Sequence, residues 1–207
     1  MANICIFGDS VAHGGSDFEY GGWAVQLGGF YEKNGVDRWN HVYNLGIDGN
    51  TTEKITKRFD AEAGVRRVDV CIFATGVQDS KYFITPDQTQ TSVDDFKKLI
   101  ETLVRKAKVF TNHIIFIGIA NVDEGKVHPI PWGSTNESYG NENIKKFNDI
   151  IKNVCDESNV SFIDMAGLFD VKKDFHDGVH PNTHGHKKMY KRIRDFLIEN
   201  QFIKLKN

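Results

Sequence analysis

The residues best suited to chemistry fall in four segments, each associated with an apolar run typical of a buried strand. These segments are FGDS (7–10), NLGIDGNTT (44–52), TGVQDS (75–80) and FHDGVHPNTHGH (175–186). They hold a hydroxyl, flexible glycines, an amide and imidazoles beside carboxylates, which are the groups that acyl transfer requires. The carboxyl ends of parallel strands meet at one edge of a sheet, where ligands bind. We therefore expect the four segments to lie together.

Ser10 and His180 have the residue types of a nucleophile and its general base. A serine hydroxyl is too weakly acidic to attack an ester unaided, so it needs a base within hydrogen-bond reach. His180 can take the proton, and Asp177, three residues earlier, can hold the far ring nitrogen and fix the tautomer. The pattern predicts a catalytic triad of Ser10, Asp177 and His180. His184 and His186 are alternatives for the base, but neither has a carboxylate at that spacing.

The attacked carbonyl oxygen becomes negatively charged and needs hydrogen-bond donors that are already in place. We expect these donors to be the backbone N–H groups of Ser10 and Gly49 and the side-chain amide of Gln78. The loss of one such donor typically raises the barrier by about 3–4 kcal/mol. Glycines at positions 46 and 49 permit a positive φ and a close approach of the backbone to a ligand.

The same segments, in the same order, are similar to the motifs of the SGNH hydrolases, the GDSL esterase and lipase superfamily. FGDS resembles the block with the nucleophilic serine, and NLGIDGNTT the block whose glycine donates to the oxyanion. GVQD resembles the Gly-x-Asn-Asp block, and DGVHPN the Asp-x-x-His block. The resemblance covers residues 7–182 and implies a flavodoxin-like α/β/α fold. It also implies ester hydrolysis without a metal or organic cofactor, with the functional residues Ser10, Gly49, Asp177 and His180.

Gln78 departs from the pattern of this family, which has asparagine at the corresponding position of the third block. Glutamine carries the same amide on a stem one methylene longer, with one more rotatable bond and therefore less preorganisation. Three outcomes are open: a working donor, a displaced donor with slower turnover, or a site adapted to another ligand.

The elements that must position these residues alternate along the chain. Short apolar, β-branched runs are typical of strands, and longer runs with apolar residues three and four positions apart are typical of helices. The predicted strands are Ile4–Phe7, His41–Leu45, Val68–Ala74, Ile114–Ile119 and Val160–Asp164. The predicted helices are Gly22–Asn34, Thr52–Arg67, Val93–Lys108, Glu142–Ser158 and Thr183–Asn200, with Thr52 as an N-cap.

This alternation predicts an α/β fold, a three-layer α/β/α sandwich around a mostly parallel five-stranded sheet. No linker or repeat divides the 207 residues, so we expect one domain over residues 1–207. The two longest irregular stretches are residues 80–91 and 121–141. Loops this long tend to carry function, and we interpret the second either as a wall of the binding site or as an ordinary surface loop.

Several polar residues near these segments allow a structural interpretation as well as a functional one. Taken alone, Ser10 is typical of a hydroxyl that caps a following segment, and the three further segments are what favour a nucleophile. Asp9 and Asp79 are expected to tie their own loops through hydrogen bonds to backbone N–H groups. His13 and Trp132 are candidates for substrate binding, although either residue also fits a purely structural role.

The histidine cluster suggests a second kind of chemistry. His176, His180, His184 and His186 fall within eleven residues, and imidazoles beside carboxylates can bind zinc. Pro181 argues against one continuous helix that would present them on a single face. We therefore predict no metal, with exposed or helix-capping roles for the histidines other than His180.

The composition narrows the possible partners and location. A net charge of −2 provides no basic field for nucleic acid or for acidic membranes. Three cysteines with no pairing pattern fit a reducing compartment, so we expect a cytoplasmic protein. A secreted chain that has lost its signal peptide would look the same. The sequence does not indicate the oligomeric state.

We predict a serine esterase, a carboxylic ester hydrolase for small or medium esters, with an O-acetylated carbohydrate as a candidate substrate. One alternative is an ester- or carbohydrate-binding relative that has lost turnover because Gln78 replaces the usual asparagine. A metal-dependent hydrolase built on the histidine cluster is the other alternative.

Overall fold

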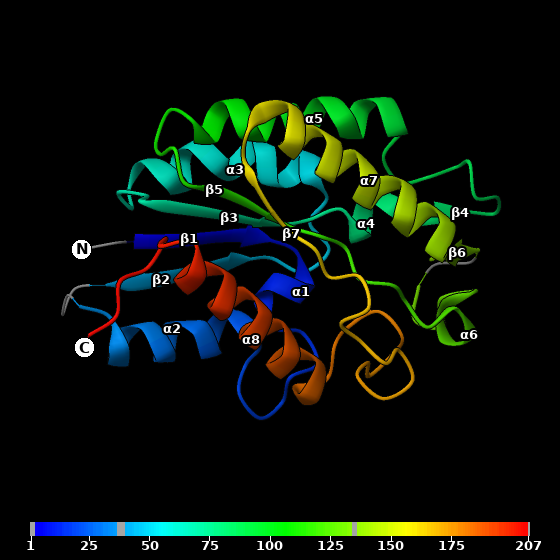
Figure 1. The fold of residues 1–207 in the computed structure, drawn as a ribbon. Coiled ribbons are helices and arrows are strands. Elements are labelled where there is room, and N and C mark those ends of the chain that lie inside the picture. Colours follow the sequence, from blue (N-terminus) through cyan, green and yellow to red (C-terminus); the bar gives the residue numbers. More distant parts are fainter. Residues whose placement is uncertain (1–2, 37–39, 134–135, 207) are drawn as a thin grey trace.

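The computed structural model describes residues 3–36, 40–133 and 136–206 and contains a five-stranded sheet at its centre (Figure 1). The strands lie in the order β2-β1-β3-β5-β7, and every neighbouring pair is parallel. Counted among these five strands alone, this is the order 2-1-3-4-5 of the flavodoxin-like folds. The strands are β1 (Asn3–Gly8), β2 (His41–Gly46), β3 (Val70–Ala74), β5 (Ile114–Ile117) and β7 (Ser161–Ile163).

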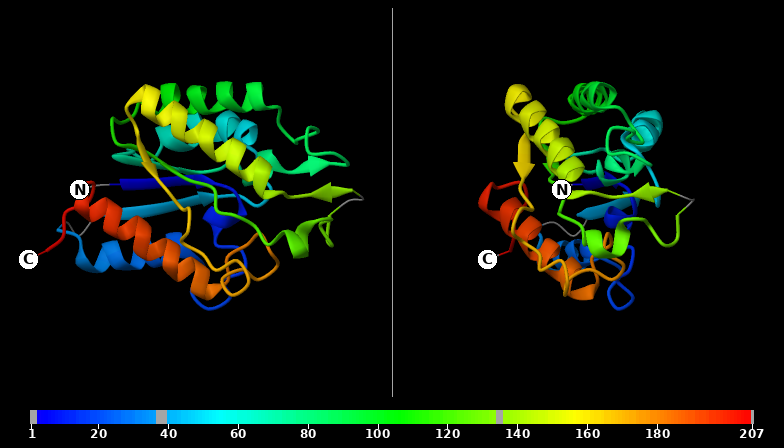
Figure 2. Two further views of the ribbon diagram at one scale, coloured as in Figure 1. Left: turned by 45° about the vertical axis from the view of Figure 1, so that its right-hand side comes forward. Right: turned by 90° about the vertical axis from the view of Figure 1, so that its right-hand side faces the viewer.

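Helices cover both faces of this sheet, and the end-on view in Figure 2 separates the two layers. One layer contains α3 (Thr52–Gly64), α5 (Val93–Ala107) and α7 (Asn141–Ser158). The opposite layer contains α2 (Trp23–Asn34) and α8 (Thr183–Glu199). The predicted three-layer α/β/α sandwich is therefore confirmed.

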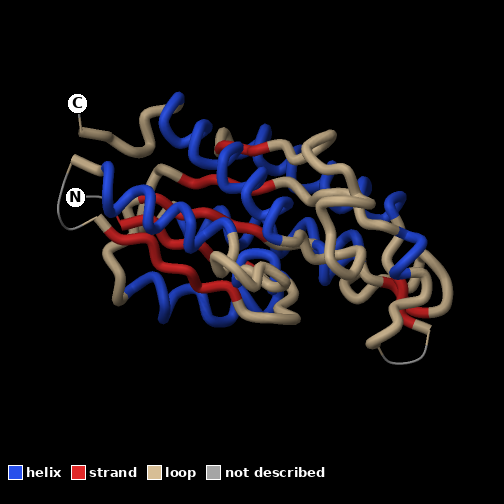
Figure 3. Tube along the Cα trace, turned by 90° about the horizontal axis from the view of Figure 1, so that it is seen from below, coloured by secondary structure: helices blue, strands red, loops and turns tan. Residues whose placement is uncertain are grey.

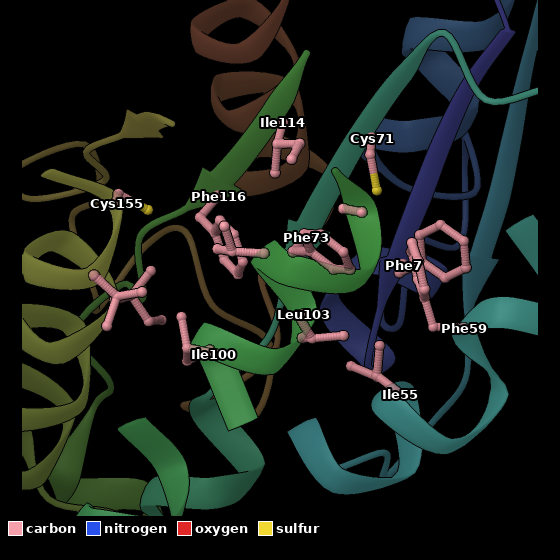
Figure 4. Packing of buried hydrophobic residues seen from close by; sticks show 14 of the residues in the cluster. Phe7, Ile55, Phe59, Cys71, Phe73, Ile100, Leu103, Ile114, Phe116 and Cys155 are labelled. Atoms are coloured by element: carbon pink, nitrogen blue, oxygen red, sulfur yellow. The ribbon is translucent and has the colours of Figure 1, made fainter. Parts of the chain in front are cut away.

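Side chains alternate along the central strands and pack against both helical layers. In β1, Cys5 and Phe7 face the layer of α3, α5 and α7, whereas Ile4 and Ile6 face the layer of α2 and α8. Figure 4 shows Phe7 close to Phe59 of α3 in the first of these cores. Burial of both faces explains why the strands are almost continuously apolar in sequence.

Short elements gather at one end of the molecule, beyond the carboxyl ends of the strands (Figure 1). β4 (Tyr82–Phe83) and β6 (Glu137–Ser138) form a small antiparallel sheet. The short helices are α1 (Ser10–His13), α4 (Val77–Ser80) and α6 (Glu124–Val127). Figure 3 shows long loops at the same end, while both chain termini lie at the other.

The start of α3 differs from the sequence-based expectation. Thr51 is the N-cap of this helix, and Thr52 is its first residue. The Thr52 hydroxyl does not cap the helix, because it donates to the Asp79 carboxylate at 2.8 Å. Thr52 is fully buried and holds α3 against the loop that follows β3.

Candidate active site

Strand register brings three of the four chemical segments to one edge of the sheet. Gly8, near the end of β1, lies opposite Gly46 of β2 on one side and Ala74 of β3 on the other. The chain leaves these three strands at the same level, and the order of the sheet reverses between β1 and β3. Such a switch point is where ligands bind in open α/β sheets.

The close approach of α1 to β2 depends on glycine. A Cβ atom at Gly46 would lie only 2.3 Å from the backbone nitrogen of His13, so a larger residue would push α1 away from the sheet. Asp9 is the N-cap of α1, and its Oδ1 accepts a hydrogen bond from the Val11 N–H at 2.9 Å. The loop-tying role expected for Asp9 is confirmed, and Ser10 becomes the first residue of α1.

Ser10, His180 and Asp177 lie in one continuous chain of hydrogen bonds. The Ser10 Oγ atom is 2.8 Å from His180 Nε2, and His180 Nδ1 is 2.6 Å from Asp177 Oδ2. The other carboxylate oxygen of Asp177 accepts from the backbone N–H groups of Val179 and His180 at 2.9 and 2.8 Å. These bonds fix the carboxylate, which in turn orients the imidazole toward the hydroxyl.

The electrostatics favour a charged Asp177 and support a positive charge on His180. Burial alone would raise the pKa of the Asp177 carboxyl, but the hydrogen bonds from His180 and Val179 lower it to about 2. Burial alone would lower the pKa of His180, and the hydrogen bond and negative charge of Asp177 outweigh it, so the His180 pKa is raised.

A third carboxyl group lies close to this chain. Asp9 is almost fully buried, and burial raises the pKa of its carboxyl to about 7, against the lowering effect of the hydrogen bond from Val11. When Asp9 is ionised, its negative charge raises the pKa of His180 further. The buried charge of Asp9 therefore acts on the imidazole in the same direction as Asp177.

The three expected oxyanion donors all follow strands that end at this edge. Ser10 begins α1, so its N–H has no partner within the helix. Gly49 lies in an exposed turn after β2 with a φ of 69°, the left-handed region that glycine tolerates. Gln78 lies in α4, half-buried, and its side-chain amide lowers the pKa of the Tyr139 hydroxyl, so the two side chains lie near each other.

Tyr139 is a residue that sequence analysis missed. It is buried in a small apolar cluster that also contains Val77 and Val179, the neighbours of Gln78 and His180. Burial raises the pKa of the Tyr139 hydroxyl, so this hydroxyl stays neutral at ordinary pH. Tyr139 belongs to the segment 121–141, of which residues 134–135 lie outside the described chain.

The segment 121–141 lies against the loop that carries the histidine and its carboxylate. The backbone N–H of Asp123 donates to the carbonyl of Gly178 at 2.8 Å. A Cβ atom at Gly178 would lie 2.9 Å from side-chain atoms of both Lys126 and Val127. These contacts support the interpretation of the segment as a wall of the site.

Asp79 links two loops rather than tying only its own, which corrects the expectation for this residue. Its carboxylate is fully buried and accepts from the backbone N–H and hydroxyl of Thr52 and from the Thr91 hydroxyl. The hydroxyl oxygen of Thr52 also lies 2.9 Å from that of Thr75. The loops after β2 and β3, which hold Gly49 and Gln78, are thereby joined.

Arg58 of α3 is a second residue that the sequence did not indicate. One terminal nitrogen donates to the carbonyl oxygens of Gly8 and Leu45 at 3.1 and 2.7 Å. The Nε atom donates to the side-chain oxygen of Asn50 at 3.0 Å. Arg58 therefore connects the ends of β1 and β2 with the turn that follows Gly49.

The remaining histidines do not converge. His176 is exposed, and His184 is bonded to Asp174 through Nδ1 at 2.7 Å. His186 is fully buried, contrary to expectation: its Nδ1 accepts from the Trp23 N–H, and its Nε2 donates to the Gly15 carbonyl. Burial lowers the pKa of His186, which favours this neutral form. Among the described residues, no group of three or more His, Cys, Asp or Glu is arranged to hold a metal ion.

The two residues suggested for substrate binding are both exposed. His13 Nδ1 lies 2.7 Å from Asp48 Oδ1, which places His13 beside the turn of Gly49. Trp132 is 52% exposed and lies between α6 and β6, at the carboxyl end of the sheet.

A small cavity of about 50 Å³ lies beside the segments that contain Ser10 and His180, although neither of these two residues lines it. Its walls include the sequence neighbours of Ser10, which are Asp9 and Val11, and those of His180, which are Val179 and Pro181. The other walls are mainly apolar side chains from the ends of β3, β5 and β7, so the cavity suits an apolar group of a few atoms.

Two further observations concern the whole chain. The three cysteines are free and buried. None of the helices in the described ranges has the length and apolarity needed to cross a membrane.

The fold and the site define a hydrolase with a flavodoxin-like sheet. A model of the GDSL-like lipase/acylhydrolase family matches residues 6–188, so the chain belongs to that family of carboxylic ester hydrolases. The resemblance stated from the four motifs is thereby confirmed.

Individual proteins are similar to this chain in fold or in sequence. The fold is similar to the crystal structure of a lipase/acylhydrolase from Enterococcus faecalis, with a TM-score of 0.81 and 20% sequence identity. The match covers 100% of both chains. An acetylxylan esterase from Geobacillus stearothermophilus is 24% identical over 168 residues, which are 76% of this chain and 71% of that protein. A multidomain esterase from Ruminococcus flavefaciens is 40% identical over 63 residues, 29% of this chain. The match spans only 8% of the length of that esterase.

Proposed function

We propose that the protein is a serine esterase that works through an acyl-enzyme. The observation that carries the proposal is the hydrogen-bonded chain from Ser10 through His180 to Asp177. In the acetylxylan esterase from Geobacillus stearothermophilus, replacements of one serine and one histidine by alanine are named catalytic mutants, which supports the same residue types here.

In the first half-reaction, the Ser10 oxygen attacks the ester carbonyl carbon while His180 Nε2 takes the hydroxyl proton. The resulting imidazolium is stabilised by Asp177, and the carbonyl oxygen takes the negative charge. The N–H groups of Ser10 and Gly49 and the amide of Gln78 donate to that oxygen. His180 then returns the proton to the leaving alcohol, and the acyl group stays on Ser10.

Hydrolysis of the acyl-enzyme repeats these roles with water as the nucleophile. His180 takes a proton from water, the hydroxide adds to the acyl carbon, and the second tetrahedral intermediate uses the same donors. Its collapse releases the carboxylic acid and returns the proton to Ser10. No metal or organic cofactor takes part in this scheme.

For the substrate, we propose a small acyl group on a carbohydrate, with acetyl as the preferred acyl group. The small apolar cavity beside the triad supports a short acyl chain. The acetylxylan esterase among the relatives supports a carbohydrate as the alcohol. His13 and Trp132 are proposed to contact the substrate from the rim of the site.

We further propose that residues 1–207 act as one hydrolase domain in the cytoplasm. The location rests on the three free, buried cysteines, which suit a reducing compartment. Small esters are the proposed partners, without nucleic acid or membrane.

The test compares hydrolysis of p-nitrophenyl acetate and acetylated xylo-oligosaccharides by the native chain and by Ser10→Ala. We expect turnover of both esters by the native chain and a loss of at least about 10³-fold in the variant. A native chain that binds the acetylated sugar without releasing acetate would instead favour a binding protein. Activity removed by a chelator and restored by zinc would favour a metal-dependent hydrolase.

A further inference from the structure

The loop between α1 and α2 exposes an aromatic ring at the edge of the active site. Phe18 is 82% exposed, more than any other large hydrophobic residue among those described. Its ring centre lies 5.6 Å from that of His176, and the two rings are nearly perpendicular, with an interplanar angle of 82°. An edge-to-face pair of this kind leaves ring surface open to solvent.

Both rings belong to segments that contact Ser10 or His180. Gly15, three residues before Phe18, donates its N–H to the Ser10 carbonyl at 2.8 Å. A Cβ atom at Gly15 would lie 3.4 Å from the imidazole carbon Cδ2 of His180. On the other segment, the His176 N–H donates to the His180 carbonyl at 2.9 Å. The Phe18–His176 pair therefore lies beside the reacting side chains rather than on a remote surface.

The backbone beneath Phe18 is held by a buried carboxylate. Asp17 accepts hydrogen bonds from the backbone N–H groups of Glu19, Tyr20 and Gly22. It also accepts from the hydroxyl of Thr183, at the start of α8, at 2.9 Å. The backbone N–H groups of this loop donate inward to Asp17, and the Phe18 side chain lies on the outer side of the loop.

The backbone beneath His176 is held in a similar way. The Lys126 ammonium group donates to the His176 carbonyl at 3.2 Å, and Phe175 and Pro181 form an isolated antiparallel bridge. The backbone that carries each ring is therefore held in place before a ligand arrives, which reduces the entropic cost of binding.

A flat, exposed ring next to an ester-cleaving site suits the alcohol side of a carbohydrate ester. One face of a pyranose carries mainly C–H groups, which pack against an aromatic ring and remove both surfaces from water. The His176 imidazole and the Tyr20 hydroxyl can form hydrogen bonds with the hydroxyl groups of the sugar, because both side chains are exposed.

We propose that Phe18 and His176 form an aromatic platform that binds the sugar ring of the substrate. This assignment rests on the proposed esterase function and adds the residues that select a carbohydrate over a simple alcohol. The acyl group then lies toward the small cavity, and the sugar lies over the loop between α1 and α2.

The test uses the ratio of kcat/KM for an acetylated xylo-oligosaccharide to kcat/KM for ethyl acetate, which has no ring to stack. Phe18→Ala should lower this ratio about tenfold, mainly through KM for the sugar ester. Phe18→Trp should restore the ratio because it keeps a flat ring, whereas Phe18→Leu should not. His176→Ala should lower the ratio in the same direction.

Val109→Ala is the matched control, because Val109 is 79% exposed and lies in the turn between α5 and β5, at the amino end of the sheet. It should leave the ratio unchanged. An unchanged ratio in Phe18→Ala, or full restoration by Phe18→Leu, would overturn the platform while the esterase function stands. Native protein that cleaves ethyl acetate but no acetylated sugar would also overturn it. Failure to cleave any ester would refute the proposed function itself.

Discussion

His180 Nε2 lies 2.8 Å from the hydroxyl oxygen of Ser10, although 170 positions separate the two residues in sequence. The first residue of α1 and the loop before α8 provide the two side chains, so the fold brings together segments from opposite ends of the chain. This dependence on the whole fold makes the pair a sensitive point for testing the proposed mechanism.

Asp177→Asn should lower kcat by about 10⁴-fold, because an asparagine can hold the imidazole in the wrong tautomer and does not stabilise the imidazolium. The measurement is steady-state hydrolysis of p-nitrophenyl acetate, with circular dichroism to verify the fold. A variant that keeps most of its turnover would mean that Asp177 does not serve His180.

The rate should rise with pH as His180 loses its proton, because only the neutral imidazole acts as a base. Since the carboxylate of Asp177 raises the pKa of His180 above its ordinary value of 6.5, the midpoint of kcat/KM should lie above pH 6.5. Asp9→Asn removes a second negative charge and should move this midpoint toward lower pH. A midpoint that stays in place would show that the buried Asp9 carboxyl has no influence on His180.

Gln78→Ala should lower kcat by about 10²–10³-fold if the amide donates to the oxyanion. Gln78→Asn should retain more activity than the alanine variant, because it keeps the amide on a shorter stem. Tyr139→Phe keeps the ring but removes the hydroxyl that lies near the Gln78 amide, and it should lower kcat by roughly tenfold or less. Equal activity in native protein and Gln78→Ala would exclude the amide from the oxyanion site.

Arg58→Lys should lower kcat/KM with little change in the sheet itself, because lysine loses the forked contacts to Gly8, Leu45 and Asn50. Arg66→Lys is the control, since Arg66 donates to the Glu62 carbonyl near the end of α3 and packs over Tyr43. Activity loss of the same size in both variants would indicate a general effect of losing a guanidinium group.

The long elements are predictable from sequence because their signals are local. The apolar periodicity of α5 reproduces its observed bounds to within one residue, and β1 is only one residue longer at each end than its apolar run. β4 and β6 are not predictable, because each has two residues and exists only through pairing with the other.

The candidate site is partly predictable for a similar reason. Motifs at strand ends indicate Ser10, Asp177 and His180 before any coordinates are known. Arg58, by contrast, has the sequence context of a solvated helix residue, and only the tertiary structure brings it to the carbonyls of β1 and β2. His186 is buried because Gly15 and Trp23 satisfy its two nitrogens, and no local pattern signals those partners.

The most direct test is covalent labelling of the native chain with a fluorophosphonate, followed by mass spectrometry of the peptides. Attack by Ser10 forms an oxygen–phosphorus bond and releases fluoride, so we expect one adduct per chain, on Ser10. The label should be absent in Ser10→Ala and strongly slowed in His180→Ala. An adduct on a different residue, or undiminished ester hydrolysis by Ser10→Ala, would contradict the mechanism.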